Sequence, residues 1–207
     1  MIRKMRAIEY NTLMTLLKLL LDRVPIIAND YGMGGINIPI LPEYPSDLTD
    51  LEKPSIIMRK VDTRQSKVGL GNVLGQHYDN ELGGYVDVVG KIHDIMVQFD
   101  IVSSNNTNVS ILQSLIADDI LNKISFEENG KIILYDFIDD INNPTEMGYI
   151  KLIGDPHVVT VEDEDKSTTL DHFGVVRHNF SILQAVVPKQ EYVDLSKWIR
   201  QTYTIKI

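Results

Sequence analysis

Histidines are the residues of this 207-residue chain with the clearest potential for chemistry. His172 and His178 stand six positions apart in or beside a predicted strand, so both side chains could project from one face of a sheet. Asp171 precedes His172, and the pair His93–Asp94 could join them from another strand. Two or three such groups can bind zinc. A metal-dependent hydrolase that uses His172 and His178 is therefore one interpretation, although no H-x-x-x-H or H-E-x-x-H spacing supports it. The five histidines are His77, His93, His157, His172 and His178.

Two glycine-rich segments have some likeness to phosphate-binding loops. Segment 32–35 reads Gly-Met-Gly-Gly and lacks the Gly-Lys-Ser/Thr ending whose amides and lysine hold phosphates. Segment 69–75 has one residue too many for the G-x-G-x-x-G pattern and precedes no predicted helix. We interpret both segments as flexible loops and predict no cofactor.

Signals for covalent or acid–base catalysis are equally sparse. The chain has no cysteine, which removes disulfides, thiolate nucleophiles and cysteine-bound metals together. It also has no G-x-S-x-G motif. The acidic run 162–165 could supply carboxylates for metal-dependent hydrolysis, but neighbouring acids in a turn usually point into water. We therefore predict that the protein is not an enzyme, and we assign no catalytic, cofactor-binding or metal-binding residue.

Length and composition predict one soluble domain spanning residues 1–207. The chain is 43% hydrophobic and 24% charged, which is ordinary for a globular protein with a real core. The apolar stretch 13–21 is too short for the roughly 20 residues that cross a bilayer, and it contains Lys18. No cleavage site of a signal peptide follows it. We expect no membrane partner.

The net charge of −9, from 20 basic and 29 acidic residues, argues against a dedicated nucleic-acid-binding protein. Affinity for DNA comes mainly from Lys and Arg that neutralise phosphates. Ordinary acidic solubility is the simpler explanation of this charge. The same sign would also suit a surface past which DNA must move without binding.

The elements that would position any site are clearest in residues 91–124. One side of a predicted strand carries His93, Ile95, Val97, Phe99 and Ile101, and the other side is mostly polar. This alternation is typical of a half-buried strand. A polar turn at 103–108 follows, and then apolar residues recur at helical spacing. These helical positions are Leu112, Leu115, Ile116, Ile120 and Ile124.

The remaining pattern predicts an α+β fold with a mainly antiparallel sheet, helices packed on one face and long extended loops or arms. A helix is expected over about 5–23, bounded by Pro25, and no βαβ alternation follows it. Further strands are expected at 54–61, 85–102, 131–138, 149–153, 158–161 and 173–187, with a short helix after Pro188 and a terminal strand at 203–207.

Two segments, 26–54 and 62–84, look like long arms. Four prolines and three glycines interrupt the first, and five glycines interrupt the second, yet together they contain many Ile, Leu and Tyr side chains. A monomer would leave these side chains poorly covered. They either wrap around a neighbouring copy, as in ring-forming proteins, or form flexible insertions.

Residues 85–125 resemble the central part of bacteriophage tail terminator and neck (head–tail completion) proteins. The resemblance rests on Ile-x-Val-x-Phe-Asp-Ile-Val-Ser at 95–103, a polar turn, and Leu-Ile-Ala-Asp-Asp-Ile-Leu at 115–121. Outside this part the chain agrees with the family only in the order of its elements. The long arm at 26–54 and the strands after Lys131 exceed a minimal tail terminator, which leaves other neck or baseplate roles open.

The resemblance implies a non-enzymatic virion structural protein, assembled in the host cytoplasm as a homo-oligomer, commonly a hexameric ring. Such a ring terminates polymerisation of the tail tube and joins the tail to the head connector. Its partners would be the tail tube protein and the connector proteins, with double-stranded DNA passing through the lumen unbound. The alternatives are another neck or baseplate structural protein, the metal-dependent hydrolase described above, and a small cytosolic binding module with a ligand pocket.

Overall fold

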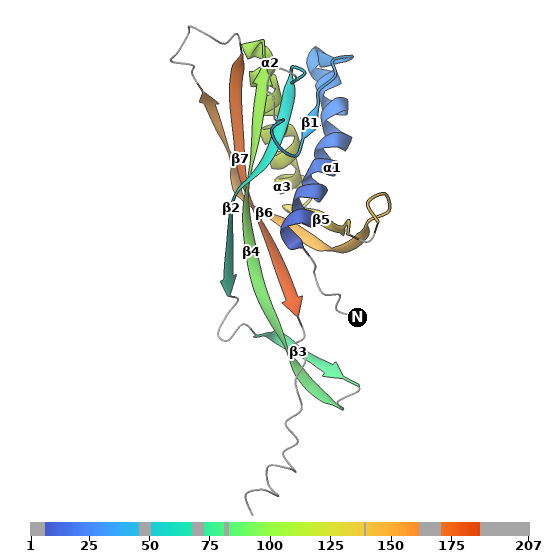
Figure 1. The fold of residues 1–207 in the computed structure, drawn as a ribbon. Coiled ribbons are helices and arrows are strands. Elements are labelled where there is room, and N and C mark those ends of the chain that lie inside the picture. The colour runs from blue at the N-terminus through green and yellow to red at the C-terminus, as the bar shows by residue number, and fades with distance from the viewer. Residues whose placement is uncertain are drawn as a thin grey trace, which may run out of the picture.

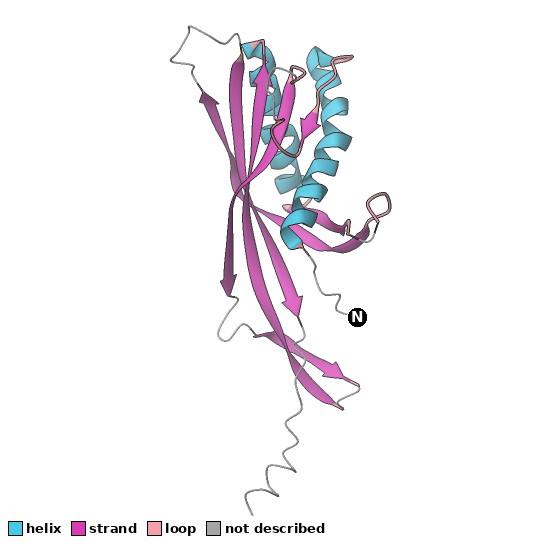
Figure 2. Ribbon diagram, viewed as in Figure 1, coloured by secondary structure: helices cyan, strands magenta, loops and turns pink. Residues whose placement is uncertain are grey.

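The computed structural model describes residues 7–45, 51–67, 73–80, 83–138, 140–161 and 171–186 (Figure 1). Two long helices pack on one face of a curled seven-stranded sheet (Figure 2). The sheet order is β1-β2-β4-β7-β6-β5, and β3 pairs with β4. Every strand pair is antiparallel except β1 with β2. The predicted α+β class is confirmed. The strands are β1 (Ile40–Leu41), β2 (Ser55–Lys67), β3 (Val73–Asp79), β4 (Gly84–Ser103), β5 (Lys131–Asp136), β6 (Thr145–Val161) and β7 (His172–Val186).

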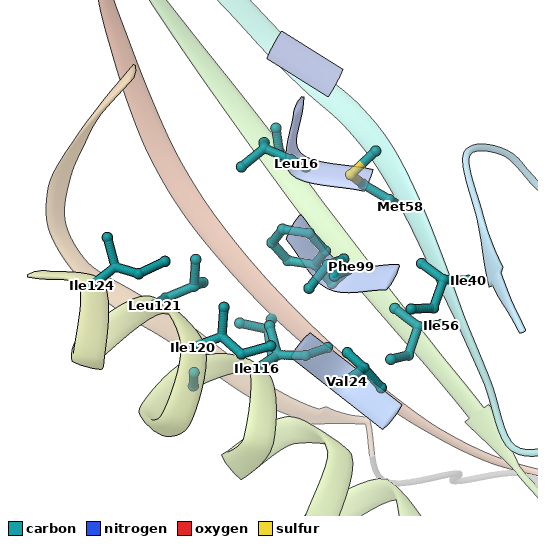
Figure 3. Close-up of a cluster of buried hydrophobic side chains, with 14 of the residues drawn as sticks. Leu16, Val24, Ile40, Ile56, Met58, Phe99, Ile116, Ile120, Leu121 and Ile124 are labelled. Carbon is teal, nitrogen blue, oxygen red and sulfur yellow. The ribbon is translucent and has the colours of Figure 1, made fainter. Parts of the chain in front are cut away.

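Strand β4 is the centre of the core, as its alternation predicts. The side chains of Ile95, Val97, Phe99 and Ile101 face the helices and are at most 1% exposed. Phe99 lies between α1, β2 and the second helix, where it contacts the largest apolar cluster (Figure 3). Burying an aromatic side chain of this size stabilises the fold by a few kcal/mol, about 2 to 3.

The second helix forms where its apolar spacing predicts. It runs through α2 (Asn106–Ser114), the π-helical segment η4 (Leu115–Asn122) and α3 (Lys123–Glu127). Asn105 caps its start, with the side chain accepting a hydrogen bond of 2.9 Å from the Thr107 N–H. The predicted helical stripe is fully buried: Leu112, Leu115, Ile116, Ile120 and Ile124.

Gly174 lets this helix approach the sheet closely. A Cβ atom at Gly174 would lie 2.5 Å from Cγ1 of Val109 and 2.7 Å from Cδ of Gln113, which is too close for any side chain. The Gln113 amide then donates a hydrogen bond of 2.9 Å to the carbonyl of Val159 on β6. Glycine at this position therefore fixes the separation between α2 and β7.

The first helix, α1 (Ile8–Ala28), confirms the expected element but not its end at Pro25. Pro25 removes one backbone donor, which would otherwise bond to the carbonyl of Leu21. The Leu21 side chain is 51% exposed, so this side of the helix is open to water, which can satisfy the carbonyl. Val24 and Ala28 are buried and hold the helix against the core. A π-helical turn, η1 (Asn29–Met33), continues it further.

The expectation of an extended arm over 26–54 is only partly right. Residues 26–33 are helical, and β1 pairs in parallel with the start of β2. Met33, Ile40 and Leu51 are each at most 8% exposed within this single chain. For these residues the expected burial against a neighbouring copy is wrong, because they already pack within this chain: Met33 and Ile40 belong to the main core cluster, and Leu51 packs with Ile57 and Val102.

The expectation of a loop over 62–84 is wrong for residues 62–67 and 73–79. Strand β2 continues to Lys67, and Val73–Asp79 form β3. Residues 68–72 and 81–82, within this segment, lie outside the described residues, as do the acidic run 162–165, the helix after Pro188 and the terminal strand. Glycine suggested irregular backbone, but pairing along β4 satisfies the main-chain hydrogen bonds and overrides that local preference.

Helices able to cross a bilayer, judged by length and hydropathy, do not occur in the described parts of the chain.

Candidate assembly surface

One long β-hairpin dominates the shape of the molecule. Val89 of β4 pairs with Val186 of β7 and also with Val73 of β3, so β3 must lie on the opposite side of β4 from β7. This is the side already occupied by β2. Strands β2 and β3 therefore follow one another along β4 and form one arm of the hairpin. The other arm is β4 itself, whose 20 residues extend about 65 Å at the usual rise per residue.

The far end of this hairpin projects beyond the body of the protein. Among the described residues, 84–88 of β4 pair with β3 alone, because the pairing with β7 stops at Val89 and the pairing with β2 at Lys91. The helices cover the other end of the sheet and do not reach this one (Figure 1). A two-stranded ribbon on its own is at best marginally stable in water. Val86 on one face of this ribbon is 3% exposed, so it is the opposite face that needs cross-strand contacts or a partner surface.

Two tyrosines provide cross-strand contacts near the tip of the projection. Tyr78 and Tyr85 are directly opposite each other, with ring centroids 5.2 Å apart at an interplanar angle of 75°. On the same face, Nε2 of Gln76 donates to Oδ1 of Asp87 at 3.2 Å. The tyrosines remain 47% and 71% exposed. Rigid amphipathic rings of this kind are enriched in protein–protein interfaces, so the tip is a candidate contact surface.

The sheet face opposite the helices carries a row of polar side chains across four strands. Arg59 of β2, Gln98 of β4, Arg177 of β7 and His157 of β6 are successive partners in the strand register. Nε of Arg177 donates to Oε1 of Gln98 at 2.6 Å. The row places two guanidinium groups on an otherwise acidic protein. It is suited to polar contacts with a partner rather than to proton transfer.

Asp100 is a buried carboxylate that joins this polar row beside the equally buried Gln98. It is 4% exposed and forms an ion pair with Nε of Arg59 at 2.8 Å. The Tyr44 hydroxyl and the Gln98 amide both donate hydrogen bonds to its carboxylate, the former at 2.8 Å. Burial and the bond to Asp100 raise the pKa of Tyr44 to about 12. These contacts hold the segment around Tyr44 over the edge of the sheet, and they compensate the buried charge.

A shallow groove of about 440 Å³ lies on the same outer face of the sheet. Within it, Oγ of Ser181 donates to Oδ1 of Asp94 at 2.6 Å, and Nε of Arg64 lies 3.0 Å from Oδ2 of Asp62. Both carboxylates thus already have a partner. The groove adds polar area to the candidate contact surface and has no group poised for chemistry. Its lining is Asp62, Arg64, Ile92, Asp94, Met96, Ile153, Asn179 and Ser181.

The structure does not bring the predicted metal ligands together. Six strand positions place His172 and His178 about 20 Å apart along β7. His178 is 3% exposed, and burial lowers its pKa to about 4. Asp171 instead forms an ion pair of 2.6 Å with Lys53. Within the described ranges, no three His, Cys, Asp or Glu side chains gather as a metal site would require.

Where they are described, the two glycine-rich segments belong to a helix and a strand rather than to a phosphate-binding loop. Gly32 lies inside η1 with a φ of 76°, a conformation that glycine adopts without strain. Gly75 lies within β3 as a strand residue. The part of the second segment at 69–72 lies outside the described residues.

Sequence reasoning missed both the tyrosine pair and the Asp100 network. A signal for the hairpin was present, because Val73–Asp79 and 85–89 are strand-like runs separated by a turn that contains Gly83-Gly84. The Asp100 network had no sequence signal, since Tyr44, Arg59 and Arg177 are far apart along the chain and meet only through the strand register.

No protein-family model matches the sequence, and no curated protein is similar to it. The function is therefore inferred from the fold, the projecting hairpin and the outer face of the sheet.

Proposed function

We propose that this protein is a non-enzymatic structural protein of a tailed-phage virion, and that copies of it assemble into a ring at the head-proximal end of the tail. The projecting β3–β4 hairpin is the observation that carries the assembly part of this proposal. The tip exposes two large aromatic side chains, Tyr78 and Tyr85, on one face of a two-stranded ribbon. Contact with a second copy would bury them.

The contact would be heterologous. The hairpin tip lies at one end of the molecule and the helices at the other (Figure 1). A tip that docks on a different surface of the next copy gives a head-to-tail interaction, which closes into a ring when the rotation per copy divides a full turn. Tyr78 and Tyr85 are 47% and 71% exposed, so their complete burial removes roughly 180 to 300 Å² from water, about a quarter to a third of a standard interface half of about 800 Å².

The virion part of the proposal is supported by the resemblance of segments 95–103 and 115–121 to tail terminator and neck proteins. In the structure these segments are the central strand and the buried helix of the core. The ring would stop growth of the tail tube and join the tail to the head connector. The alternative is another neck or baseplate structural protein, which would meet a different partner. The net charge of −9 would limit adhesion of DNA in the lumen.

The test uses the full chain, with light scattering and negative-stain electron microscopy in the presence and absence of purified phage tail tubes. We expect ring-shaped oligomers alone, or rings at one end of the tubes. A protein that stays monomeric under both conditions would contradict the proposal.

The role of the hairpin tip is tested separately with Tyr78→Ser combined with Tyr85→Ser. We expect this variant to remain folded by circular dichroism and to lose the oligomer. Tyr149→Ser is the matched control, because Tyr149 is 60% exposed on β6, away from the hairpin. Loss of the oligomer in the control as well would show that the tip has no special role.

A further inference from the structure

The outer edges of the sheet differ in how well they are protected. An unpaired edge strand presents free N–H and C=O groups to which another chain can add, so proteins block such edges with charges, proline, bulges or covering segments. Strand β5 ends the sheet on one side, and α1 covers its edge. The N–H of Tyr135 donates to Oγ1 of Thr15 at 3.2 Å. The N–H of Phe137, just after β5, donates to Oδ1 of Asn11 at 3.1 Å.

The edge of β2 is largely unpaired but is blocked in other ways. Among the described residues, β1 pairs only with Ile56 and Ile57 at the start of this strand. Residues 59–67 include five charged side chains, and a bulge interrupts them at Val61. Charges and bulges are the usual devices that prevent the addition of a further strand, so this edge is a poor acceptor.

The last part of β6 is unpaired and has none of these protections. Strand β5 pairs only with residues 145–151 of β6, and a bulge that contains Pro156 follows. Residues 157–161 then pair with β7 and, in the described parts of the chain, with no strand on the other side. They read His-Val-Val-Thr-Val, which lacks Lys, Arg, Asp, Glu and Pro and is rich in residues that favour strands.

The strand register shows which main-chain groups of this segment point outward. The N–H of Ile56 donates to the carbonyl of Pro39, on the side of β2 that faces away from β4. In antiparallel pairs the main-chain groups of successive residues point alternately to the two sides of the strand. Followed across β4 and β7 to β6, this alternation turns the N–H and C=O groups of Val158 and Thr160 away from the sheet.

The contact of α2 with this segment leaves the edge open. The Gln113 amide donates to the carbonyl of Val159, which the same alternation directs toward β7. Nε2 of Gln113 is also 3.4 Å from the carbonyl of Val175, the partner of Val159, as expected when both carbonyls lie between the two strands. The Val158 side chain is 46% exposed. An incoming strand can therefore reach this edge.

The hairpin tip offers the strand that fits. Residues 73–79 of β3 also have an unpaired side within the described structure, and they contain no Lys, Arg or Pro. The alternation turns the main-chain groups of Gln76 and Tyr78 outward on that side. The other unpaired side of the tip, on residues 84–88, is shorter, because β7 pairs with β4 from Val89 onward. The β3 edge and the β6 segment lie on opposite sides of β4 and toward opposite ends of the molecule (Figure 1).

We propose that residues 157–161 of β6 are the acceptor edge for assembly, and that β3 of a second copy adds to them as a further strand. This inference rests on the proposed assembly of copies and names its acceptor surface. Main-chain hydrogen bonds then join Val158 and Thr160 to the outward groups of β3. Because two different edges meet, the interaction is head-to-tail, and each copy uses β3 toward one neighbour and β6 toward the other.

The first test is hydrogen exchange of the backbone amides in the full-length protein, measured with and without assembly and read by mass spectrometry after quenching. We expect exchange at Val158 and Thr160 to slow at least about tenfold on assembly. The amides of Lys60 and Gln65, on the blocked edge of β2, should exchange as before. An oligomer in which Val158 and Thr160 still exchange freely overturns this inference and leaves the assembly proposal intact. Absence of any oligomer overturns both.

A proline substitution tests the acceptor edge itself. Val158→Pro removes an outward N–H without removing a bond to β7, so we expect a folded protein by circular dichroism whose assembly is weakened at least about tenfold. Gln65→Pro makes the same change on the edge of β2 and is the matched control, which should assemble normally. Normal assembly of Val158→Pro, or an equal loss in Gln65→Pro, overturns the inference. If Val158→Pro does not fold, hydrogen exchange in the unmodified protein decides.

Cysteine cross-linking identifies the occupant of the edge. The natural chain has no cysteine, so a short bismaleimide joins only introduced thiols. A mixture of Val158→Cys and Gln76→Cys should give a cross-linked dimer of the two variants. Cross-linking of Val158→Cys to itself would indicate that two β6 edges pair, and an oligomer without the mixed cross-link would indicate a different contact. Either result overturns the assignment of β3 to this edge.

Discussion

At the scale of single residues, the contribution of several side chains to stability depends on what surrounds them rather than on residue type. Gly174 is one of them, because two side chains of α2 occupy the space that a Cβ atom would need. His178 is another, because it is enclosed in the core beside Phe180, with ring centroids 5.0 Å apart. Tyr44 is a third, through its bond to Asp100. Each position leads to a separate prediction.

Gly174→Ala should lower the free energy of unfolding by about 1 to 3 kcal/mol, since the new methyl group forces α2 away from β7. Urea unfolding monitored by circular dichroism measures the change. Gly75→Ala is the control, because a Cβ atom at that position meets nothing within 4 Å. Equal losses in the two variants would mean that close packing does not explain Gly174.

The protein should lose stability as the pH falls from about 6.5 to 4, because burial lowers the pKa of His178 to about 4. In that interval the unfolded chain binds a proton that the folded chain does not, so protonation favours unfolding. The loss is on the order of 3 kcal/mol. Urea unfolding at several pH values measures it, and His178→Leu should flatten the profile in this interval. An unchanged profile in the variant would assign the loss to other groups.

Tyr44→Phe should lower the free energy of unfolding by about 1 kcal/mol, since it removes one of the donors that compensate the Asp100 carboxylate. Tyr31→Phe is the comparison. Its hydroxyl bonds to Asp119 at 2.6 Å, which raises the pKa of Tyr31, but that bond is exposed to solvent. We expect a smaller loss there in the same unfolding experiment. A larger loss for Tyr31→Phe would contradict the importance of the buried network.

At the scale of elements, the long hairpin and the helical layer have separable roles. The core lies where α1 and the second helix cover β4 and its neighbours. The part of the hairpin beyond Val89 provides no residue of that core cluster. The element that builds the fold and the element that we propose for assembly are thus different parts of the same strand.

Replacement of residues 68–90 by Asn-Gly should therefore leave a folded protein that no longer assembles. Lys67 and Lys91 are directly paired, so a two-residue turn can join them. Circular dichroism and thermal unfolding test the fold, and light scattering tests the oligomer. Retention of the oligomer in this variant would exclude the hairpin as the assembly element.

At the scale of the whole molecule, charge is the property with the most direct consequence. The chain has nine more acidic than basic residues, so an assembled ring is strongly anionic. We expect neither the monomer nor the ring to retain double-stranded DNA in a gel-shift assay at physiological salt. Strong binding with a steep dependence on salt would instead indicate that Arg59 and Arg177, on the outer face of the sheet, bind DNA phosphates.

The elements with a local sequence pattern could be predicted without a structure. The alternation of residues 93–101 and the helical spacing of 112–124 define an apolar face without reference to any other segment, and both faces are buried as predicted. The lack of βαβ alternation likewise indicated the α+β class. Local patterns suffice here because the period of a strand or helix fixes which side chains share a face.

The conformation of the glycine-rich and proline-containing segments depends on contacts between distant parts of the chain. Local preference indicated loops, but pairing with β4 holds residues 73–79 in a strand, and packing of Val24 and Ala28 carries α1 past Pro25. The tyrosine pair, the Asp100 network and the unpaired edge of β6 likewise depend on strand register. Such contacts join residues that are distant in the chain, and the local pattern of a sequence does not predict which distant residues come into contact.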